Sequence, residues 1–448
     1  MKKFLEHNFK YLFYIFLFAL PWQTRLFLYQ GQLKNEYSEF LSVSLYGSDI
    51  ILLVLLLVAG IIWFNKFKAE TKPEFRKNKL WWALAALDAV FLVSAFLAGN
   101  RLVAFYHYFL FLAGVALFLI LSQTKHFHLN KIKTFYVLLS SLFLHAVLGI
   151  YQFLSQSTFA CKYLGLAQHL PYSLAGESVL ENSAGRWLRS YGGFDHPNIF
   201  GVMMVFAILL CIYLLLHHSQ NKKWLNLNVV FLFSFTLALF FSFSRGAWLA
   251  LSAAFVVWIL VEYQKSILIY RSKFFRQPLF WGLLLLLLIF FLEYGNLVAT
   301  RVSATDRLEA KSISERIDYL VDAKNLIQSN WLIGVGPGNY VEAALKINPS
   351  QAFWYYQPVH NYFVLLFAEL GVFGLLFWLA FLTLLLWRLS IERRGHGFNL
   401  ALGAVLLTTM MLEHFFFSLH FGILMLWIIL GLIYNKQYEQ IQNKEIKE

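Results

Sequence analysis

The sequence predicts an all-α polytopic membrane protein with about twelve transmembrane helices, and three observations lead to this class. Hydrophobic residues make up 59% of the 448 positions and charged residues only 14%, and the mean hydropathy is +0.60. Such a composition excludes an ordinary soluble domain. Apolar runs of bilayer-spanning length, roughly 17 to 25 residues, recur along the whole chain. The basic residues stand in small groups between these runs, which indicates a topology signal and not a nucleic-acid-binding surface.

The predicted helices follow one another from the first residues to the last. Lys2, Lys3 and the apolar run behind them resemble a signal peptide, but no small-residue cleavage site follows Pro21, so we interpret this run as an uncleaved first span. A helical bundle absorbs the full length, and we treat residues 1–448 as a single membrane-embedded domain. The twelve spans are predicted at residues 9–28, 46–64, 80–98, 103–122, 134–154, 197–217, 225–243, 246–263, 279–293, 359–386, 398–416 and 419–434.

The distribution of Lys and Arg predicts the orientation of these spans. If the N-terminus is cytoplasmic, every inner connection is basic and the short outer connections carry few basic residues. Both termini are then cytoplasmic, and the protein is a multi-pass protein of the cytoplasmic (inner) membrane. Residues 155–196 form an outer loop. Residues 294–359, between helices 9 and 10, form the main outer, periplasmic loop, which carries part of the candidate active site.

The main outer loop contains an amphipathic segment and a glycine-rich turn. Ser312 to Glu315 fit a capping box that starts a helix, and we expect this helix to lie on the membrane surface. Arg316 stands at the border of its apolar face, where it either snorkels to lipid headgroups or binds a phosphate. The turn at 334–339 matches neither a Walker A loop nor a dinucleotide fingerprint. We interpret it as a helix stop, with phosphate cradling as the alternative. The apolar face is formed by Ile313, Ile317, Leu320, Val321 and Ile327.

His360 is predicted in the first turn of the tenth span. The helix dipole there disfavours the imidazolium, and a neutral imidazole can act as a base. The alternative is a structural histidine that bonds to the neighbouring loop. Glu369 is excluded as its orienting carboxylate, because nine helical residues place it on the opposite side of the helix and roughly 13 Å deeper.

Three further groups of polar residues face outward. Arg245 lies in the tight turn 242–246, either as an interface anchor or as a ligand. Asp195 precedes Pro197 at the start of the sixth span and is expected to cap it. The last outer turn gathers Glu413, His414 and His420, which either pair with one another or line one cavity.

Four motifs stand out between about residues 190 and 430. They are Phe243-Ser244-Arg245-Gly246-Ala247-Trp248, Gly334-Val335-Gly336-Pro337-Gly338-Asn339, His360-Asn361-Tyr362-Phe363 and Gly193-Phe194-Asp195-His196-Pro197-Asn198. As a set, they resemble those of the O-antigen ligase and polymerase family of bacterial membrane glycosyltransferases. The resemblance implies a twelve-helix protein that moves an oligosaccharide from undecaprenyl pyrophosphate to an acceptor hydroxyl outside the cytoplasmic membrane, without metal or nucleotide cofactor. The implied acceptor is lipid A-core, a growing glycan or another cell-surface molecule.

By position, the resemblance implies that Arg245 and Arg316 bind phosphate and that His360 is essential, so these three are the candidate catalytic residues. Arg301 and Arg307 are alternatives to Arg316. The candidate substrate-binding residues are Asn361, His196, Asn198, Arg307, Glu413 and His414, and no metal site is expected.

Elementary chemistry favours the same reaction. A lipid pyrophosphate is a donor that arrives already activated, and its anionic leaving group needs guanidinium groups more than a general acid. The alternative is a transporter or flippase of lipid-linked oligosaccharide, which would carry charges near the membrane midplane. Only Asp88, His145 and Glu369 are predicted there, so we favour the enzyme. Ligases, polymerases and protein O-glycosylating transferases share these motifs, and the sequence does not separate them.

Overall fold

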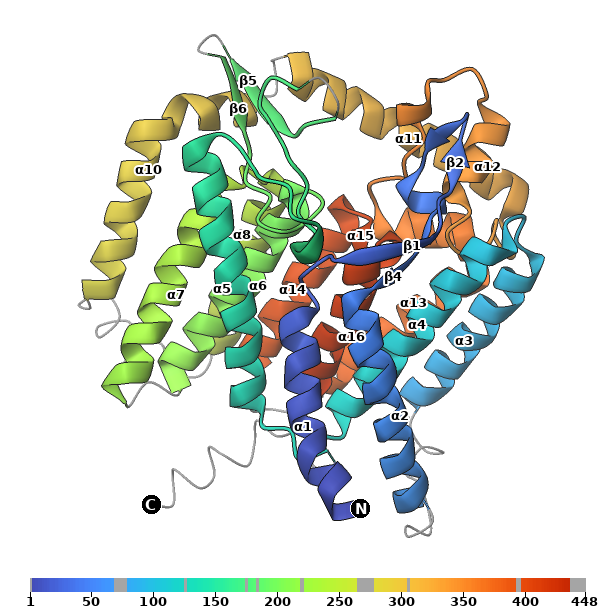
Figure 1. The fold of residues 1–448 in the computed structure, drawn as a ribbon, viewed down its shortest axis with the longest axis horizontal. Coiled ribbons are helices and arrows are strands. Elements are labelled where there is room, and N and C mark those ends of the chain that lie inside the picture. The colour runs from blue at the N-terminus through green and yellow to red at the C-terminus, as the bar shows by residue number, and fades with distance from the viewer. Residues whose placement is uncertain are drawn as a thin grey trace.

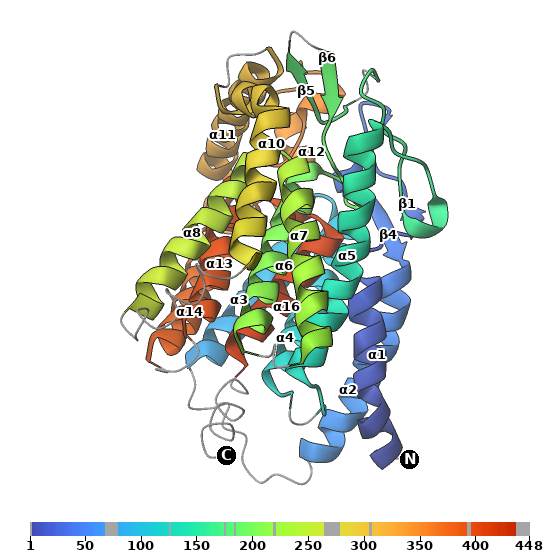
Figure 2. The ribbon, with the colours of Figure 1, turned by 90° about the vertical axis from the view of Figure 1, so that its left-hand side faces the viewer.

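The computed structural model shows a bundle of apolar helices with short strands, loops and two further helices gathered at one end (Figures 1 and 2). The helices α11 and α12 and the strands β5 and β6 lie at this end in both views, and α1 begins at the opposite end. The described residues are 2–67, 79–124, 127–173, 176–182, 185–217, 221–263, 278–303, 307–391 and 396–435. Several predicted basic inner connections, at 68–78, 264–277 and 392–395, lie outside these ranges.

The predicted membrane class is confirmed. By length and composition, eight helices of the described ranges can cross a membrane, and three shorter apolar helices accompany them. These eleven helices are α2 (Gly47–Phe67), α3 (Lys79–Leu97), α4 (Arg101–Ser122), α5 (Lys131–Ser155), α6 (Pro197–His217), α7 (Lys222–Phe241), α8 (Arg245–Tyr263), α10 (Pro278–Ser303), α13 (Tyr362–Ile391), α14 (His396–Leu412) and α16 (His420–Tyr434). Helix α1 (Lys2–Ala19) precedes them.

The prediction for the first span was wrong at its C-terminal end. Helix α1 ends at Ala19, because Pro21 has no backbone N–H to donate and restricts the residue before it. The apolar residues that follow form strand β1 (Arg25–Tyr29), which pairs antiparallel with β4 (Val43–Tyr46). A short apolar run fits a strand as well as a helix. The connection also holds β2 (Gln32–Leu33), β3 (Glu36–Tyr37) and the 3-10 helix η1 (Glu39–Leu41).

Helix α13 is broken in its third turn, where Gly371 has φ +67°. The break leaves backbone groups unpaired, and the glycine-rich turn pairs them: Val335 N donates to Ala368 O (3.0 Å) and Gly336 N to Glu369 O (3.0 Å). Glu369 Oε2 in turn accepts from Gly338 N (2.5 Å). A Cβ on Gly334 would lie 2.3 Å from the Glu369 backbone, so this contact requires glycine. The turn therefore does more than stop a helix, because its N–H groups satisfy the backbone carbonyls that the break in α13 leaves unpaired.

The main outer loop begins and folds differently from the prediction. Helix α10 kinks at Tyr294 and continues to Ser303, and α11 (Arg307–Asn330) begins five residues before the expected capping box. Ser312 therefore lies inside a helix. Helix α12 (Tyr340–Ile347) and η4 (Phe353–Tyr355) follow.

Helix α11 has two distinct faces. It buries Tyr319, Ala323 and Leu326 and packs on α13. Its predicted apolar stripe stays exposed, with Ile317 57% and Val321 52% accessible. An exposed apolar stripe suits the surface of a bilayer, and the interfacial position of α11 stays a prediction.

Candidate active site

The turn between α7 and α8 presents Arg245 beside the last turn of α10. Phe243 adopts φ +46°, and Ser244 Oγ accepts from Ala247 N (3.3 Å), which caps the start of α8. Arg245 is the first residue of that helix. The predicted tight turn is confirmed, and it holds this guanidinium on a rigid element.

A second arginine lies beside Arg245, with a buried carboxylate shared between them. Arg301, in the last turn of α10, donates from Nε to Phe243 O (2.9 Å) and forms an ion pair with Glu309. Arg245 Nη2 lies 3.1 Å from the other oxygen of Glu309, and its Nη1 donates to Arg301 O (3.1 Å). The side chain of Glu309 is only 4% exposed. Arg301, named above as an alternative to Arg316, is therefore the direct neighbour of Arg245.

Glu413 connects residues from four parts of the chain. Its Oε2 lies 3.1 Å from His360 Nδ1. Its Oε1 accepts from Asn198 Nδ2 (2.6 Å) and from Arg316 Nη2 (3.4 Å). Because an ionised carboxylate only accepts hydrogen bonds, His360 carries a proton on Nδ1 and its Nε2 is left for other partners. Glu413 is thus the carboxylate that orients His360. The sequence analysis excluded Glu369 from this role and did not assign it to another residue.

His360 lies outside the helix in which it was predicted. Helix α13 starts at Tyr362, and Asn361 caps it by accepting from Val364 N (3.0 Å). Asn361 Nδ2 donates to Met411 O (3.0 Å), which ties α13 to the end of α14. His360 therefore lies in the connection before the helix. The side-chain amide of Asn361, the next residue, uses both its oxygen and its nitrogen in hydrogen bonds within the protein.

The structure places the other candidates unequally. Arg307 is 72% exposed and pairs with Glu181 (2.8 Å). The ring of His414 lies 5.0 Å from that of His360. His420 does not join this group, because its Nε2 contacts Asp49 Oδ1 (2.6 Å). The predicted gathering at the last outer turn is therefore correct only for Glu413 and His414.

Comparison with known proteins finds two similarities. A family model described as O-antigen ligase matches residues 227–379, and an O-antigen polymerase of Salmonella muenchen is 25% identical over 287 residues. Over these stretches the chain is similar to O-antigen ligases and polymerases. The polymerase match covers 62% of this chain and spans 64% of the polymerase's own length.

The family match covers only part of the site of this ligase- and polymerase-like chain. Residues 227–379 include Arg245, Arg316 and His360, together with Arg301 and Glu309. Asn198 and Glu413, which complete the hydrogen bonds around His360, lie on either side of the matched stretch.

The electrostatics around Glu413 favour its ionised form. Burial alone would raise the pKa of Glu413, but the hydrogen bond from His360 and the charges of His360 and Arg316 outweigh burial and hold it below its ordinary value. The carboxylate is therefore charged throughout the physiological range.

His196 is held neutral by its contacts. Its Nδ1 accepts from Asn198 N (3.1 Å), so the ring proton is on Nε2, 3.0 Å from Ser178 Oγ. Burial and the charge of Arg189 lower the pKa of His196 to about 3. This histidine caps α6, the task expected of Asp195, and its Nδ1 lone pair is already used.

The sequence analysis did not identify two residues of this charged network. Glu309 was not singled out, and Arg189 was passed over within the 155–196 loop. Arg189 is 4% exposed, and its Nη2 donates to Asn198 Oδ1 (2.7 Å). No local sequence pattern identifies either residue, because their hydrogen-bond and ion-pair partners lie on other helices.

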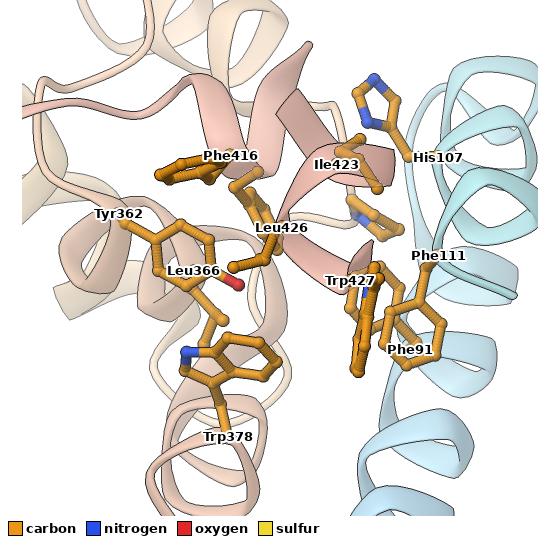
Figure 3. A pocket seen from close by; sticks show the side chains of 12 residues that line it. Phe91, His107, Phe111, Tyr362, Leu366, Trp378, Phe416, Ile423, Leu426 and Trp427 are labelled. Carbon is orange, nitrogen blue, oxygen red and sulfur yellow. The ribbon is translucent and has the colours of Figure 1, made fainter. Parts of the chain in front are cut away.

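An apolar cavity of about 20 Å³ lies inside the bundle, next to Tyr362 and the glycine-rich turn (Figure 3). Its wall is mostly aromatic and includes Trp378, Trp427 and Phe111. The charged residues described above do not line it. The candidate reactive groups therefore do not open into this internal space.

Proposed function

We propose that the chain is a membrane glycosyltransferase that moves an oligosaccharide from undecaprenyl pyrophosphate to an acceptor hydroxyl on the outer side of the cytoplasmic membrane. The observation that carries this proposal is the contrast in exposure within one charged network. The side chains of Arg245, Arg316 and His360 are 34%, 37% and 21% exposed, whereas Glu309 and Glu413 are 4% and 11% exposed. The solvent-accessible groups are thus the two guanidinium groups and the imidazole, whereas the two carboxylates are buried.

The charge balance supports an anionic donor. Arg189, Arg245, Arg301 and Arg316 face two carboxylates, Glu309 and Glu413, so the network has an excess of positive charge. A pyrophosphate ester supplies the missing negative charge, and planar guanidinium groups bind its oxygens in a fork. The exposed apolar stripe of α11, on the helix that carries Arg316, suits the lipid end of the same donor.

In the proposed reaction the acceptor hydroxyl transfers its proton to Nε2 of His360. Its oxygen forms a bond to the anomeric carbon, and the bond from that carbon to the pyrophosphate oxygen breaks. The electron pair leaves with the lipid pyrophosphate, whose charge Arg245 and Arg316 stabilise. Glu413 stabilises the imidazolium, and the proton passes to the departing pyrophosphate or to water.

Purified protein in detergent tests this function directly. Fluorescent oligosaccharide on undecaprenyl pyrophosphate is incubated with separate acceptors: lipid A-core, a second lipid-linked glycan and a serine-containing protein. We expect one acceptor to gain the labelled glycan, with release of the lipid pyrophosphate, and His360→Ala to abolish the transfer. Which acceptor gains it distinguishes a ligase from a polymerase or a protein-glycosylating enzyme. Movement of the donor across proteoliposomes, without any transfer in detergent, would instead identify a transporter.

A further inference from the structure

Arg189 lies in the segment between β6 (Gly185–Leu188) and α6, outside the stretch that the family model matches. Its guanidinium is buried and makes two hydrogen bonds to different parts of the site. Nε donates to Ser242 O (2.8 Å), in the turn that presents Arg245. Nη2 donates to Asn198 Oδ1 (2.7 Å), at the start of α6. One side chain thus connects the arginine turn with the residues around Glu413.

The chemistry of the guanidinium fixes the direction of the next hydrogen bond. Arginine only donates, so Asn198 must turn its oxygen toward Arg189. The Asn198 amide nitrogen then points to Glu413 and donates to Oε1 (2.6 Å). The opposite Glu413 oxygen accepts from His360 (3.1 Å). A series of donors therefore runs from Arg189 through Asn198 and Glu413 to His360.

We propose that Arg189 is a positioning residue, which acts through Asn198 to hold Glu413 as the hydrogen-bond acceptor of His360. The proposal rests on the proposed function only in assigning a reaction to His360. Without Arg189 the Asn198 amide is free to rotate and to present its oxygen to the Glu413 carboxylate, where two acceptors oppose each other. The carboxylate then loses a donor and is no longer fixed against the imidazole.

Keeping this arginine in place is costly, which argues against a passive packing role. Burial and the nearby charge of Arg301 lower the pKa of Arg189, whereas Tyr191, Glu309 and Glu413 oppose that shift. A buried cation persists when its hydrogen bonds and counter-charges offset the loss of water. Here the counter-charges are the two carboxylates of the site.

A double-mutant cycle tests the proposal. Arg189→Met keeps an unbranched, flexible side chain and removes every donor, and we expect kcat to fall roughly 10- to 100-fold, as for loss of a buried hydrogen bond to a charged group. In Glu413→Gln the function of Arg189 is already lost, so the double variant should match Glu413→Gln within about threefold. Losses that multiply would overturn the proposal. Arg101→Met, an exposed arginine at the start of α4, is the matched control.

Arg189→Lys provides the same cycle if the methionine variant does not fold. Lysine retains the buried charge but offers a point donor, which cannot serve Ser242 O and Asn198 Oδ1 in the geometry of the fork. We expect an intermediate loss of roughly 3- to 30-fold, again absent on the Glu413→Gln background. Wild-type activity of Arg189→Lys together with multiplied losses for Arg189→Met would reduce Arg189 to a packing residue.

A measurement without turnover separates this proposal from the proposed function. NMR of ring-labelled histidine, with the His360 signal assigned by its loss in His360→Ala, follows the hydrogen bond of this ring directly. The titratable and charged groups that face the ring are Glu413, His414, His196 and Tyr319 and, through Glu413, Arg316. We expect the downfield signal of the His360 Nδ1 proton to move upfield in Arg189→Met, because a displaced carboxylate accepts a longer and weaker hydrogen bond. An unchanged signal contradicts the proposal even if glycosyl transfer is demonstrated, and a shifted one supports it even if transfer is not found.

Discussion

Replacing Glu413 by glutamine tests the pair that it forms with His360. Three donors surround the carboxylate: His360 Nδ1, Asn198 Nδ2 and Arg316 Nη2. Glutamine has one acceptor oxygen and an amide nitrogen that donates, so it must turn a donor toward at least one of these donors. The substitution keeps the size of the side chain and removes both its charge and one acceptor.

The structure sets the size of the expected effect. When His360 takes a proton, its 3.1 Å contact with Glu413 becomes a charge-assisted hydrogen bond, worth about 1.5–3 kcal/mol. Losing that stabilisation only in the transition state lowers kcat roughly 10- to 150-fold. The KM for the donor should change less than kcat, because Arg245 is untouched and Arg316 loses a partner 3.4 Å away but keeps its own charge. His360→Ala, which removes the base itself, should cost roughly 10²- to 10⁴-fold.

The assay is glycosyl transfer in detergent, with kcat and the donor KM measured separately. Glu342→Gln is the matched control, because this carboxylate lies on α12 and pairs only with Lys346 (2.9 Å). We expect the control to stay within about twofold of the wild type, as for a surface ion pair. A folded Glu413→Gln protein with more than a third of the wild-type kcat would refute the role of Glu413 as the partner of a catalytic base.

Three other predictions follow from the site and its position. Arg245→Lys keeps the charge but not the planar fork, so the donor KM should rise and kcat fall, and near-normal kinetics would leave Arg245 an interface anchor. Burial lowers the pKa of His414 to about 3 from 6.5, so the neutral ring contributes fully to the free energy of unfolding above pH 6.5. That contribution decreases as the pH falls toward 3, and linkage gives a loss of about 2 kcal/mol of unfolding free energy at pH 5. The thermal unfolding of His414→Gln should lack this part of the pH dependence. Once Cys161 is replaced by serine, an impermeant thiol reagent should label a cysteine placed at Gln351 in intact cells but not one at Lys223, and the reverse pattern would invert the orientation.

The sequence by itself determined the class of the protein and the order of its membrane helices. Hydropathy is a local property, so each apolar run marked a helix wherever it was long enough. The error at residues 20–28 has the same origin, because an apolar run of a few residues fits both helix and strand. Short motifs also placed Arg245 and His360 at the ends of membrane helices, since turn residues and proline punctuate a chain locally.

Only the tertiary structure decided which of these residues meet. His360 and Glu413 are separated by 53 positions, and Asn198 and Glu413 by 215. Their contact depends on how far each helix is rotated and shifted along its neighbours, which packing sets and hydropathy does not. The same reason hid Glu309 and Arg189, whose buried charges are explicable only by partners on other helices. A charged residue in a sequence is expected at the protein surface, whereas in this fold Glu309 and Arg189 are buried among the residues of the candidate site.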